Sequence, residues 1–269
     1  MGILNITPDS FFDGGRYLDP EAALAQALRL VEEGADILDL GAESTRPGAL
    51  PITDREELER LLPALKRVRQ EVSIPISIDT ISPKVATACL EAGADIINDV
   101  SGLKRSGPDM AKVVKKFGAG LVLMHSRGTP ATMQSLTSYG DLVTDVMSEL
   151  RESIQIATDE GIERERIVVD PGLGFAKTLE QNLEIMKSLG AFHGLKLPVM
   201  LGPSRKSFIG QVTGRDTGER EFGTAACVAA AVANGIQIVR VHDVKAMRDV
   251  ILTTEAIGRP RSIISNTEF

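Results

Sequence analysis

The sequence has few of the residues that mark several large protein classes. It contains no tryptophan, two cysteines and three histidines in 269 residues. Cys89 and Cys227 lie far apart in alanine-rich stretches, with neither a CxxC partner nor the spacing of metal ligands. This pattern argues against a disulfide framework and a structural zinc site. We expect two buried free thiols in a reducing compartment.

Positive charge and long apolar runs are also scarce. The formal net charge of −7 argues against a broad nucleic-acid or membrane surface, although a small anion needs only a local group of cations. The longest apolar helical stretch, Thr224 to Ala233, is about half of the roughly 20 residues that a membrane span needs. The N-terminus lacks the layout of a secretory signal. We therefore expect a cytoplasmic, soluble protein with no nucleic-acid or membrane partner.

Four stretches share one plan, in which a helix end is followed by glycine and a short branched apolar run: 31–41, 90–100, 115–125 and 232–242. The glycine suits a left-handed helix cap, and the apolar run suits a strand buried on both faces. In all, the sequence predicts eight strands, at 2–6, 36–41, 75–79, 95–98, 120–124, 166–170, 198–202 and 236–241. It predicts helices near 20–33, 54–70, 83–91, 108–117, 141–159, 178–189, 222–234 and 243–257.

Eight strand–helix units in a chain of this length favour an α/β fold, a single (β/α)8 TIM barrel that occupies residues 1–269 as one domain. A doubly wound sheet is less favoured because no G-x-G-x-x-G follows the first strand. Long loops at 7–18, 42–53 and 125–140 follow the first, second and fifth strands, at the C-terminal face where barrel enzymes keep their chemistry. His193 lies at the opposite face and is expected to be structural.

Each predicted strand has a polar group at its C-terminal end: Asn5, Asp39 with Glu43, Asp79, Asn98 with Asp99, His125, Asp170, Ser204 to Lys206, and Arg240 with His242. A single such residue can be a cap or a solvated side chain, and Asp39, Glu43, Asp99 and Arg205 stay open to that interpretation. His125 stays open between ligand contact and packing. Eight polar ends of eight indicate a ligand site, since an unpaired buried charge is costly.

One group of these residues mixes hydrogen-bond donors and acceptors: Asp79, Asn98, Asp170 and Lys206. Such a set suits a flat, neutral heterocycle, because a carboxylate can accept two parallel N–H bonds from a 2-amino-4-oxo ring. Gly172 and Gly174 would let the backbone approach that ring closely. A second group, Arg46, Arg240 and His242 with Asn5, suits a diphosphate and its Mg²⁺, a hard cation that prefers oxygen ligands.

Motifs along nearly the whole chain resemble those of the dihydropteroate synthase family: GILNITPDSFFDGG (2–15), STRPGA (44–49), SIDT (77–80), INDVSG (97–102), MHSRGTP (124–130), DPGLGFAK (170–177), SRKSFIG (204–210) and VRVHDV (239–244). The resemblance implies a (β/α)8 barrel. The implied activity joins (7,8-dihydropterin-6-yl)methyl diphosphate to 4-aminobenzoate, giving dihydropteroate and diphosphate. Family members are typically homodimers, and the small-residue helix 222–234 could pack against a second subunit.

The resemblance also implies residue roles. The pterin slot would be formed by Asp79, Asn98, Asp170 and Lys206, with Met124 packing on the ring. The diphosphate would be held by Thr45, Arg240 and His242, with Asn5 helping to bind Mg²⁺. The first two long loops would close over the site, with Asp13, Thr45 and Arg46. The aminobenzoate would be bordered by Phe175, Lys206 and Ser207.

A dissociative, SN1-like substitution follows from these charges. Mg²⁺, Arg240 and His242 would stabilise the leaving diphosphate, and Asp79 would stabilise the cation that develops on the dihydropterin. Three other interpretations stay open. They are an aldolase with a Schiff-base lysine, a pterin-binding methyltransferase with a methyltetrahydrofolate donor, and a non-catalytic pterin-binding protein.

Overall fold

Strands and helices alternate along the chain as the sequence predicts. The computed structural model describes residues 1–6, 19–43 and 52–258. The strands are β1 (Gly2–Asn5), β2 (Leu38–Gly41), β3 (Ile76–Asp79), β4 (Ile96–Asp99), β5 (Gly120–Met124), β6 (Ile167–Asp170), β7 (Met200–Leu201) and β8 (Ile238–Val239). The helices are α1 (Pro20–Glu32), α2 (Asp54–Glu71), α3 (Pro83–Glu91), α4 (Gly107–Phe117), α5 (Leu142–Asp159), α6 (Leu179–Lys187), α7 (Ser207–Thr213), α8 (Glu221–Ala233) and α9 (Val244–Gly258).

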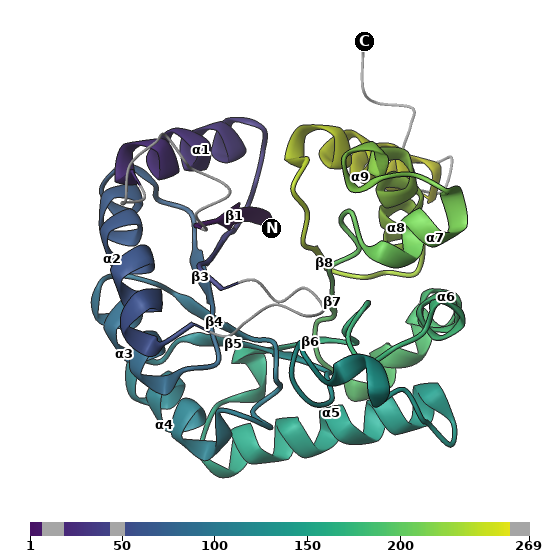
Figure 1. Ribbon diagram of the computed structural model, residues 1–269, viewed down its shortest axis with the longest axis horizontal. Coiled ribbons are helices and arrows are strands. Elements are labelled where there is room, and N and C mark those ends of the chain that lie inside the picture. The colour runs from purple at the N-terminus through teal and green to yellow at the C-terminus, as the bar shows by residue number, and fades with distance from the viewer. Residues whose placement is uncertain (7–18, 44–51, 259–269) are drawn as a thin grey trace.

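The strands form a parallel barrel surrounded by the helices (Figure 1). β1 to β6 pair in sequence order, and β7 pairs with β8. Two parallel bridges join these sheets, Val169 with Val199 between β6 and β7, and Gly2 with Val241 between β8 and β1. At the second bridge, Ile3 N donates to Val241 O at 2.9 Å. The predicted (β/α)8 barrel is confirmed.

The helices begin where the sequence signals predict. Asp19 precedes Pro20 and accepts a hydrogen bond from Glu21 N at 2.9 Å at the start of α1. Thr53 and Glu56 form a reciprocal capping box at the start of α2. Ser82 likewise caps α3, since its hydroxyl accepts from the first turn. These side chains supply acceptors for N–H groups that have no partner inside the helix.

Two features differ from the sequence prediction. β7 and β8 have only two residues each, where five and six residues were expected, because their flanks join the barrel through single bridges. The short helix α7 was not among the eight predicted helices, since its seven residues contain too little apolar periodicity to be distinguished from a loop. It ends at Gly214, whose φ of 70° is the left-handed conformation of a helix cap.

A large apolar core lies within the barrel and between strands and helices. A second, smaller cluster joins Met124, Met133, Phe175 and Ala176, with Val100 packed against it. Because Met124 ends β5 and Phe175 follows β6, this cluster lies at the C-terminal face. Cys89 and Cys227 are free thiols on α3 and α8; Cys89 is buried as expected, whereas Cys227 is only half-buried. Among the described residues, no helix is both long and apolar enough to cross a membrane.

Candidate active site

The C-terminal ends of the strands bring polar side chains to one rim of the barrel. Asn5, Asp79 and Asp170 are the last residues of β1, β3 and β6. Asn98 lies on β4 directly opposite Asp79 in the parallel register. Arg240 follows β8, and its backbone N donates to Leu201 O of β7 at 2.9 Å. The strand-end residues predicted from sequence are therefore neighbours in space.

Arg240 connects two carboxylates across the barrel. Its Nε lies 2.5 Å from Asp39 Oδ2, and its Nη2 lies 3.0 Å from Asp79 Oδ2. Asn98 Nδ2 also donates to Asp39 Oδ2, at 3.3 Å. The side chain of Asp39 is fully buried, so the interpretation of Asp39 as a cap or solvated residue is wrong. Burial beside Arg240 makes it part of the ion-pair network, where an isolated charge would be costly.

Several buried polar atoms near this network have no hydrogen-bond partner among the described residues. They include Asp39 Oδ1, Asn98 Oδ1 and Ser77 Oγ. Buried polar groups are nearly always hydrogen-bonded in native proteins. The amide oxygen of Asn98 can only accept a hydrogen bond, and so can a carboxylate oxygen of Asp39. The arrangement therefore suits a ligand that presents N–H donors to the interior of the rim.

Burial shifts the proton affinity of the charged groups at the rim. It raises the pKa of Asp79 to about 7 and that of Asp170 to about 6, although nearby cations oppose both shifts. Burial, together with the nearby Arg240 guanidinium, lowers the pKa of Lys206 to about 8. Lys206 Nζ also lies 4.3 Å from the centroid of the Phe175 ring, a cation–π contact. Groups with such shifts at one opening are typical of functional sites.

The glycines after β6 serve the loop itself. A Cβ on Gly172 would lie 2.0 Å from the carbonyl oxygen of His125, and its φ is 72°. Gly174 has a φ of 80°, and a Cβ there would lie 3.3 Å from Lys206 Cδ. The expectation that both glycines make room for a flat ligand is therefore wrong for Gly172, where the neighbouring backbone imposes the requirement. At Gly174 the constraint comes from φ and from the Lys206 side chain.

The segment after β7 is held by the segment after β8. Ser204 Oγ lies 2.9 Å from His242 Nδ1 and accepts from His242 N at 3.2 Å. Arg205 has a φ of 56°, and its guanidinium donates to both carboxylate oxygens of Asp243 at 3.1 and 2.6 Å. Arg205 is therefore not a free solvated side chain but braces this loop through its ion pair with Asp243. Ser207 is the exposed first residue of α7.

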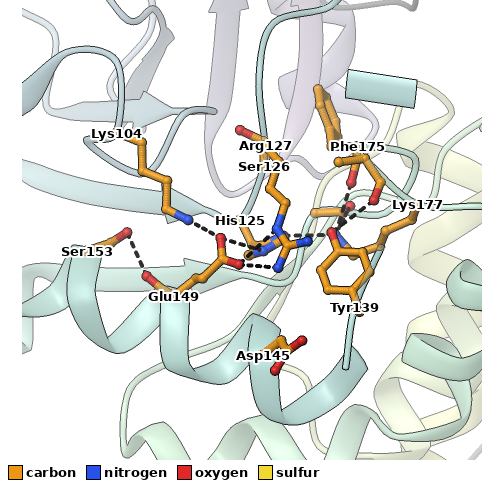
Figure 2. Close-up of polar contacts among 12 residues, drawn as sticks. Lys104, His125, Ser126, Arg127, Tyr139, Asp145, Glu149, Ser153, Phe175 and Lys177 are labelled. Carbon is orange, nitrogen blue, oxygen red and sulfur yellow. Dashed lines mark hydrogen bonds and ion pairs between the residues drawn. The ribbon is translucent and has the colours of Figure 1, made fainter. Parts of the chain in front are cut away.

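His125 is a packing residue in a buried network (Figure 2). Its Nδ1 lies 3.0 Å from Lys177 Nζ, and its Nε2 lies 3.3 Å from Glu149 Oε2. The sequence left this histidine open between the two roles, and it gave no role to Lys177 or Glu149. In the sequence, the feature that could have indicated this network is the lysine that ends the DPGLGFAK motif. His193 is structural as expected, since its Nε2 lies 2.8 Å from Asn234 O.

Other predicted residues have simpler positions. Asp99 is fully buried and accepts from Ser101 N at 2.8 Å, so it stabilises the turn after β4 and is neither a helix cap nor a solvated side chain. Burial is the largest effect on Glu43 and raises its pKa. Three residues from the first two long loops, Asp13, Thr45 and Arg46, lie outside the described residues.

A pocket opens at this face beside Asp79 and Phe175. Val100, Met133 and Pro130 give it an apolar side, and hydroxyl and guanidinium groups line the remainder. An apolar pocket with a few converging polar groups is the usual form of a small-molecule site.

The known proteins that this chain resembles in sequence and in structure belong to one enzyme family. The family model described as pterin binding enzyme matches residues 1–242. A dihydropteroate synthase of Synechocystis is 46% identical over 260 residues, covering 96% of this chain and 90% of that protein. The structure of dihydropteroate synthase from Clostridium difficile, determined with pteroic acid, has a TM-score of 0.91 and 41% identity over 97% of this chain and 96% of that one. That from Xanthomonas albilineans, with 4-aminobenzoic acid, has a TM-score of 0.90 and 41% identity, with coverages of 97% and 93%.

Proposed function

Since this chain belongs to the dihydropteroate synthase family of pterin-binding enzymes, we propose that its barrel rim divides one substitution reaction between ring-binding and anion-binding residues. The reaction is the condensation of (7,8-dihydropterin-6-yl)methyl diphosphate with 4-aminobenzoate. It yields 7,8-dihydropteroate and diphosphate. The observation that carries the division of roles is the position of Arg240, which joins Asp39 and Asp79 at the edge where Asp170 and Lys206 also lie.

The pterin ring is bound by Asp170, Asn98 and Lys206, with Met124 packed against its face. Asp170 uses Oδ1 to accept from Gly172 N at 2.7 Å, and a carboxylate retains further acceptor capacity for the N–H groups of a 2-amino-4-oxo ring. Asn98 Oδ1 is buried without a partner among the described residues and adds an acceptor. Lys206 supplies the donor for an acceptor atom of the ring.

The diphosphate is bound on the other side of Arg240. Among the described residues, Nε of that side chain donates to Asp39 and Nη2 donates to Asp79. Nη1 can therefore donate to a phosphate oxygen. His242 and the predicted loop residues Thr45 and Arg46 complete this anion site. A guanidinium already fixed by two carboxylates does not have to reorganise as charge develops on the leaving group.

Asp79 stabilises the positive charge that spreads into the dihydropterin as the C–O bond breaks. Its carboxyl group is buried, and this burial raises its pKa to about 7. A cation that forms beside it favours the ionised carboxylate, so the two charges stabilise each other most strongly in the transition state. The 4-aminobenzoate nitrogen, positioned by Phe175 and Ser207, attacks as a neutral amine. As the C–N bond forms, the nitrogen releases one N–H proton, which the departing diphosphate takes up. Asp13 is the predicted further residue of this site.

A magnesium ion carried by the substrate fits the residues at this rim. No group of three His, Cys, Asp or Glu side chains suited to a metal occurs in the part of the chain that the structure describes. Mg²⁺ in such sites is usually held by one or two protein oxygens, substrate phosphates and water. Asn5, at the end of β1, offers one amide oxygen of that kind. When bound, the ion supplies charge stabilisation for the departing diphosphate.

Three wider assignments complete the proposal. Residues 1–269 form one domain, supported by the strand ladder that returns from β8 to β1. The enzyme is a homodimer that uses α8, where Phe222 is 87% exposed on a helix rich in alanine. It works in the cytoplasm, where two free thiols would stay reduced.

The test is diphosphate release from the dihydropterin diphosphate, with 4-aminobenzoate and Mg²⁺ each omitted in turn. We expect release only from the complete mixture, together with formation of dihydropteroate. Release without 4-aminobenzoate at the same rate would refute the condensation. The variant Asp109→Asn, at an exposed position on α4, is a control that should retain the wild-type rate.

A further inference from the structure

Lys177 is a buried lysine with a complete set of acceptors. The residue is 3% exposed. Its Nζ lies 3.0 Å from Gly172 O, 3.1 Å from Phe175 O and 3.0 Å from His125 Nδ1. Burial lowers the pKa of Lys177 to about 7, so at pH 6 the amine is mostly an ammonium group, which has three N–H donors and no acceptor. Each donor therefore has one partner, and two of the three partners are carbonyls of the loop that follows β6.

This arrangement fixes the tautomer of His125. The Nδ1 atom must accept from the ammonium group, so the proton of the neutral ring resides on Nε2. Nε2 faces Glu149 Oε2 at 3.3 Å. Burial, with help from the charge of Lys177, lowers the pKa of His125 to about 4, so the ring is neutral near pH 7. The Glu149 carboxylate, the His125 imidazole and the Lys177 ammonium group thus follow one another as neighbours.

The carboxylate of Glu149 is itself held in place by two cationic side chains, Arg127 and Lys104 (Figure 2). Arg127 donates to Oε1 from Nε at 2.9 Å and from Nη2 at 2.5 Å, and Lys104 forms an ion pair with Oε2. The Arg127 guanidinium lies 3.8 Å from the centroid of the Tyr139 ring. Tyr139 Oη in turn donates to Ala176 O at 2.9 Å. The network therefore reaches a third carbonyl of the same loop.

The loop needs such support because its backbone is unusual. Gly172, Gly174 and Ala176 have φ values of 72°, 80° and 48°. Ala176 is fully buried, and an L-residue in the left-handed region persists only where its surroundings impose that conformation. The loop begins at Asp170 and carries the Phe175 ring, so its conformation decides where both side chains lie.

We propose that Lys177 is a positioning residue, whose ammonium group, oriented by His125 and Glu149, fixes the 170–177 loop so that Asp170 and Phe175 face the two substrates. This rests on the proposed function. Lys177 does not act on the reacting atoms, because all three of its donors are used on loop and imidazole acceptors. Its effect is transmitted through the Gly172 and Phe175 carbonyls.

The kinetic test compares Lys177→Met with Lys187→Met. The first variant keeps the length of the side chain and removes its donors, and the second changes an exposed lysine at the end of α6. We expect kcat/KM of Lys177→Met to fall about 100-fold per folded site, the size of effect that a 1 Å misplacement produces. KM for 4-aminobenzoate should rise and kcat should fall, while the control stays within twofold.

Titration with a tight-binding pterin counts the folded sites. A fall in activity that comes only from a smaller number of folded molecules is thereby distinguished from a fall in kcat/KM per site. If kcat and KM per folded site stay within threefold of the wild type, Lys177 has no positioning role. If the wild type itself forms no dihydropteroate, the proposed function fails, and the following measurement still decides the geometry.

That measurement is ¹⁵N NMR of the wild-type histidine rings, and it does not require a folded variant of Lys177. The chain has three histidines. The signals that are missing from the spectrum of His125→Gln are those of His125. At pH 6, with Lys177, Glu149 and Lys104 as its charged neighbours, the His125 ring should be neutral with the proton on Nε2. A proton on Nδ1 would overturn the proposal, because the ammonium group could then not donate to that atom.

Discussion

Replacing Asp170 with asparagine should weaken pterin binding and leave the loop intact. In the ligand-free protein, Asp170 Oδ1 accepts from Gly172 N at 2.7 Å. The carbonyl oxygen of asparagine can take the same place and keep that bond. The second carboxylate oxygen becomes an NH₂ group, which donates hydrogen bonds. The change therefore acts on the edge that faces the ring.

The magnitude follows from the number of hydrogen bonds. A carboxylate accepts two N–H bonds from the 2-amino-4-oxo ring, and a hydrogen bond to a charged group contributes about 1.5–3 kcal/mol. In the variant, one of these bonds becomes a bond to a neutral acceptor, and the other becomes a contact between two donors. We expect a loss of about 3 kcal/mol, which corresponds to about 100-fold weaker binding.

The pH dependence provides an independent check. Burial raises the pKa of Asp170 to about 6 in the ligand-free protein. The ring binds the ionised form, so affinity should fall about tenfold between pH 8 and pH 5, and this component should be missing in the variant. A raised pKa in the folded state also costs stability as pH rises through that value. Asp170→Asn should therefore be at least as stable as the wild type at pH 8.

Calorimetric titration with a dihydropterin alcohol, at pH 8 and pH 5, measures these affinities, and thermal denaturation measures the stability. Asp109→Asn controls for the loss of one negative charge, because Asp109 is exposed on α4. The proposed role of Asp170 would be refuted if Asp170→Asn bound the pterin within threefold of the wild type. It would also be refuted if the variant kept the same pH dependence.

Three further outcomes are expected. Gly172→Ala should lower the free energy of unfolding by about 3 kcal/mol or more, because the new Cβ meets the His125 carbonyl. Gly214→Ala, where φ is similar and the space is open, should lower it by about 1 kcal/mol, and thermal denaturation measures both losses of stability. Arg240→Met should destabilise the protein by about 3–5 kcal/mol at pH 8 and by less at pH 5, where Asp79, whose pKa burial raises to about 7, becomes protonated, as urea denaturation can show. Chelation of Mg²⁺ should stop diphosphate release, and Asn5→Ala should raise the Mg²⁺ concentration that restores half of the activity; an unchanged requirement would argue against Asn5 as a ligand.

The repeated glycine pattern accounts for much of what the sequence predicts about the fold. The glycines of VEEGADI, LEAGADI and VANGIQI have φ values of 95°, 101° and 73°, so each requires the conformation that glycine allows most readily. The apolar runs that follow are β2, β4 and the segment leading to β8. Helix ends are local events, and residues within a few positions determine them. Closure of the barrel is not local, since single bridges at Val169 and Gly2 complete it.

The site could be located from the sequence because parallel strands end at one edge. That rule brings Asp79, Asn98 and Asp170 together without any knowledge of their contacts. It does not show which side chains pair. Arg240 lies 201 residues from Asp39, and no sequence spacing predicts their ion pair. The sequence also separated an acidic ring site from a basic anion site, whereas Arg240 contacts two of the acids.

This shared contact gives Asp39 a reason to be buried. A carboxylate that cannot reach solvent is stable only beside a fixed cation, and Arg240 Nε meets it at 2.5 Å. The same contact, with Asp79 on Nη2, holds the guanidinium plane in place before a ligand arrives. A cation held in this way can respond to negative charge on a leaving group without the cost of ordering itself. In the proposed reaction, ring binding and anion binding would therefore be coupled through Arg240, and the buried Asp39 would contribute by fixing that side chain.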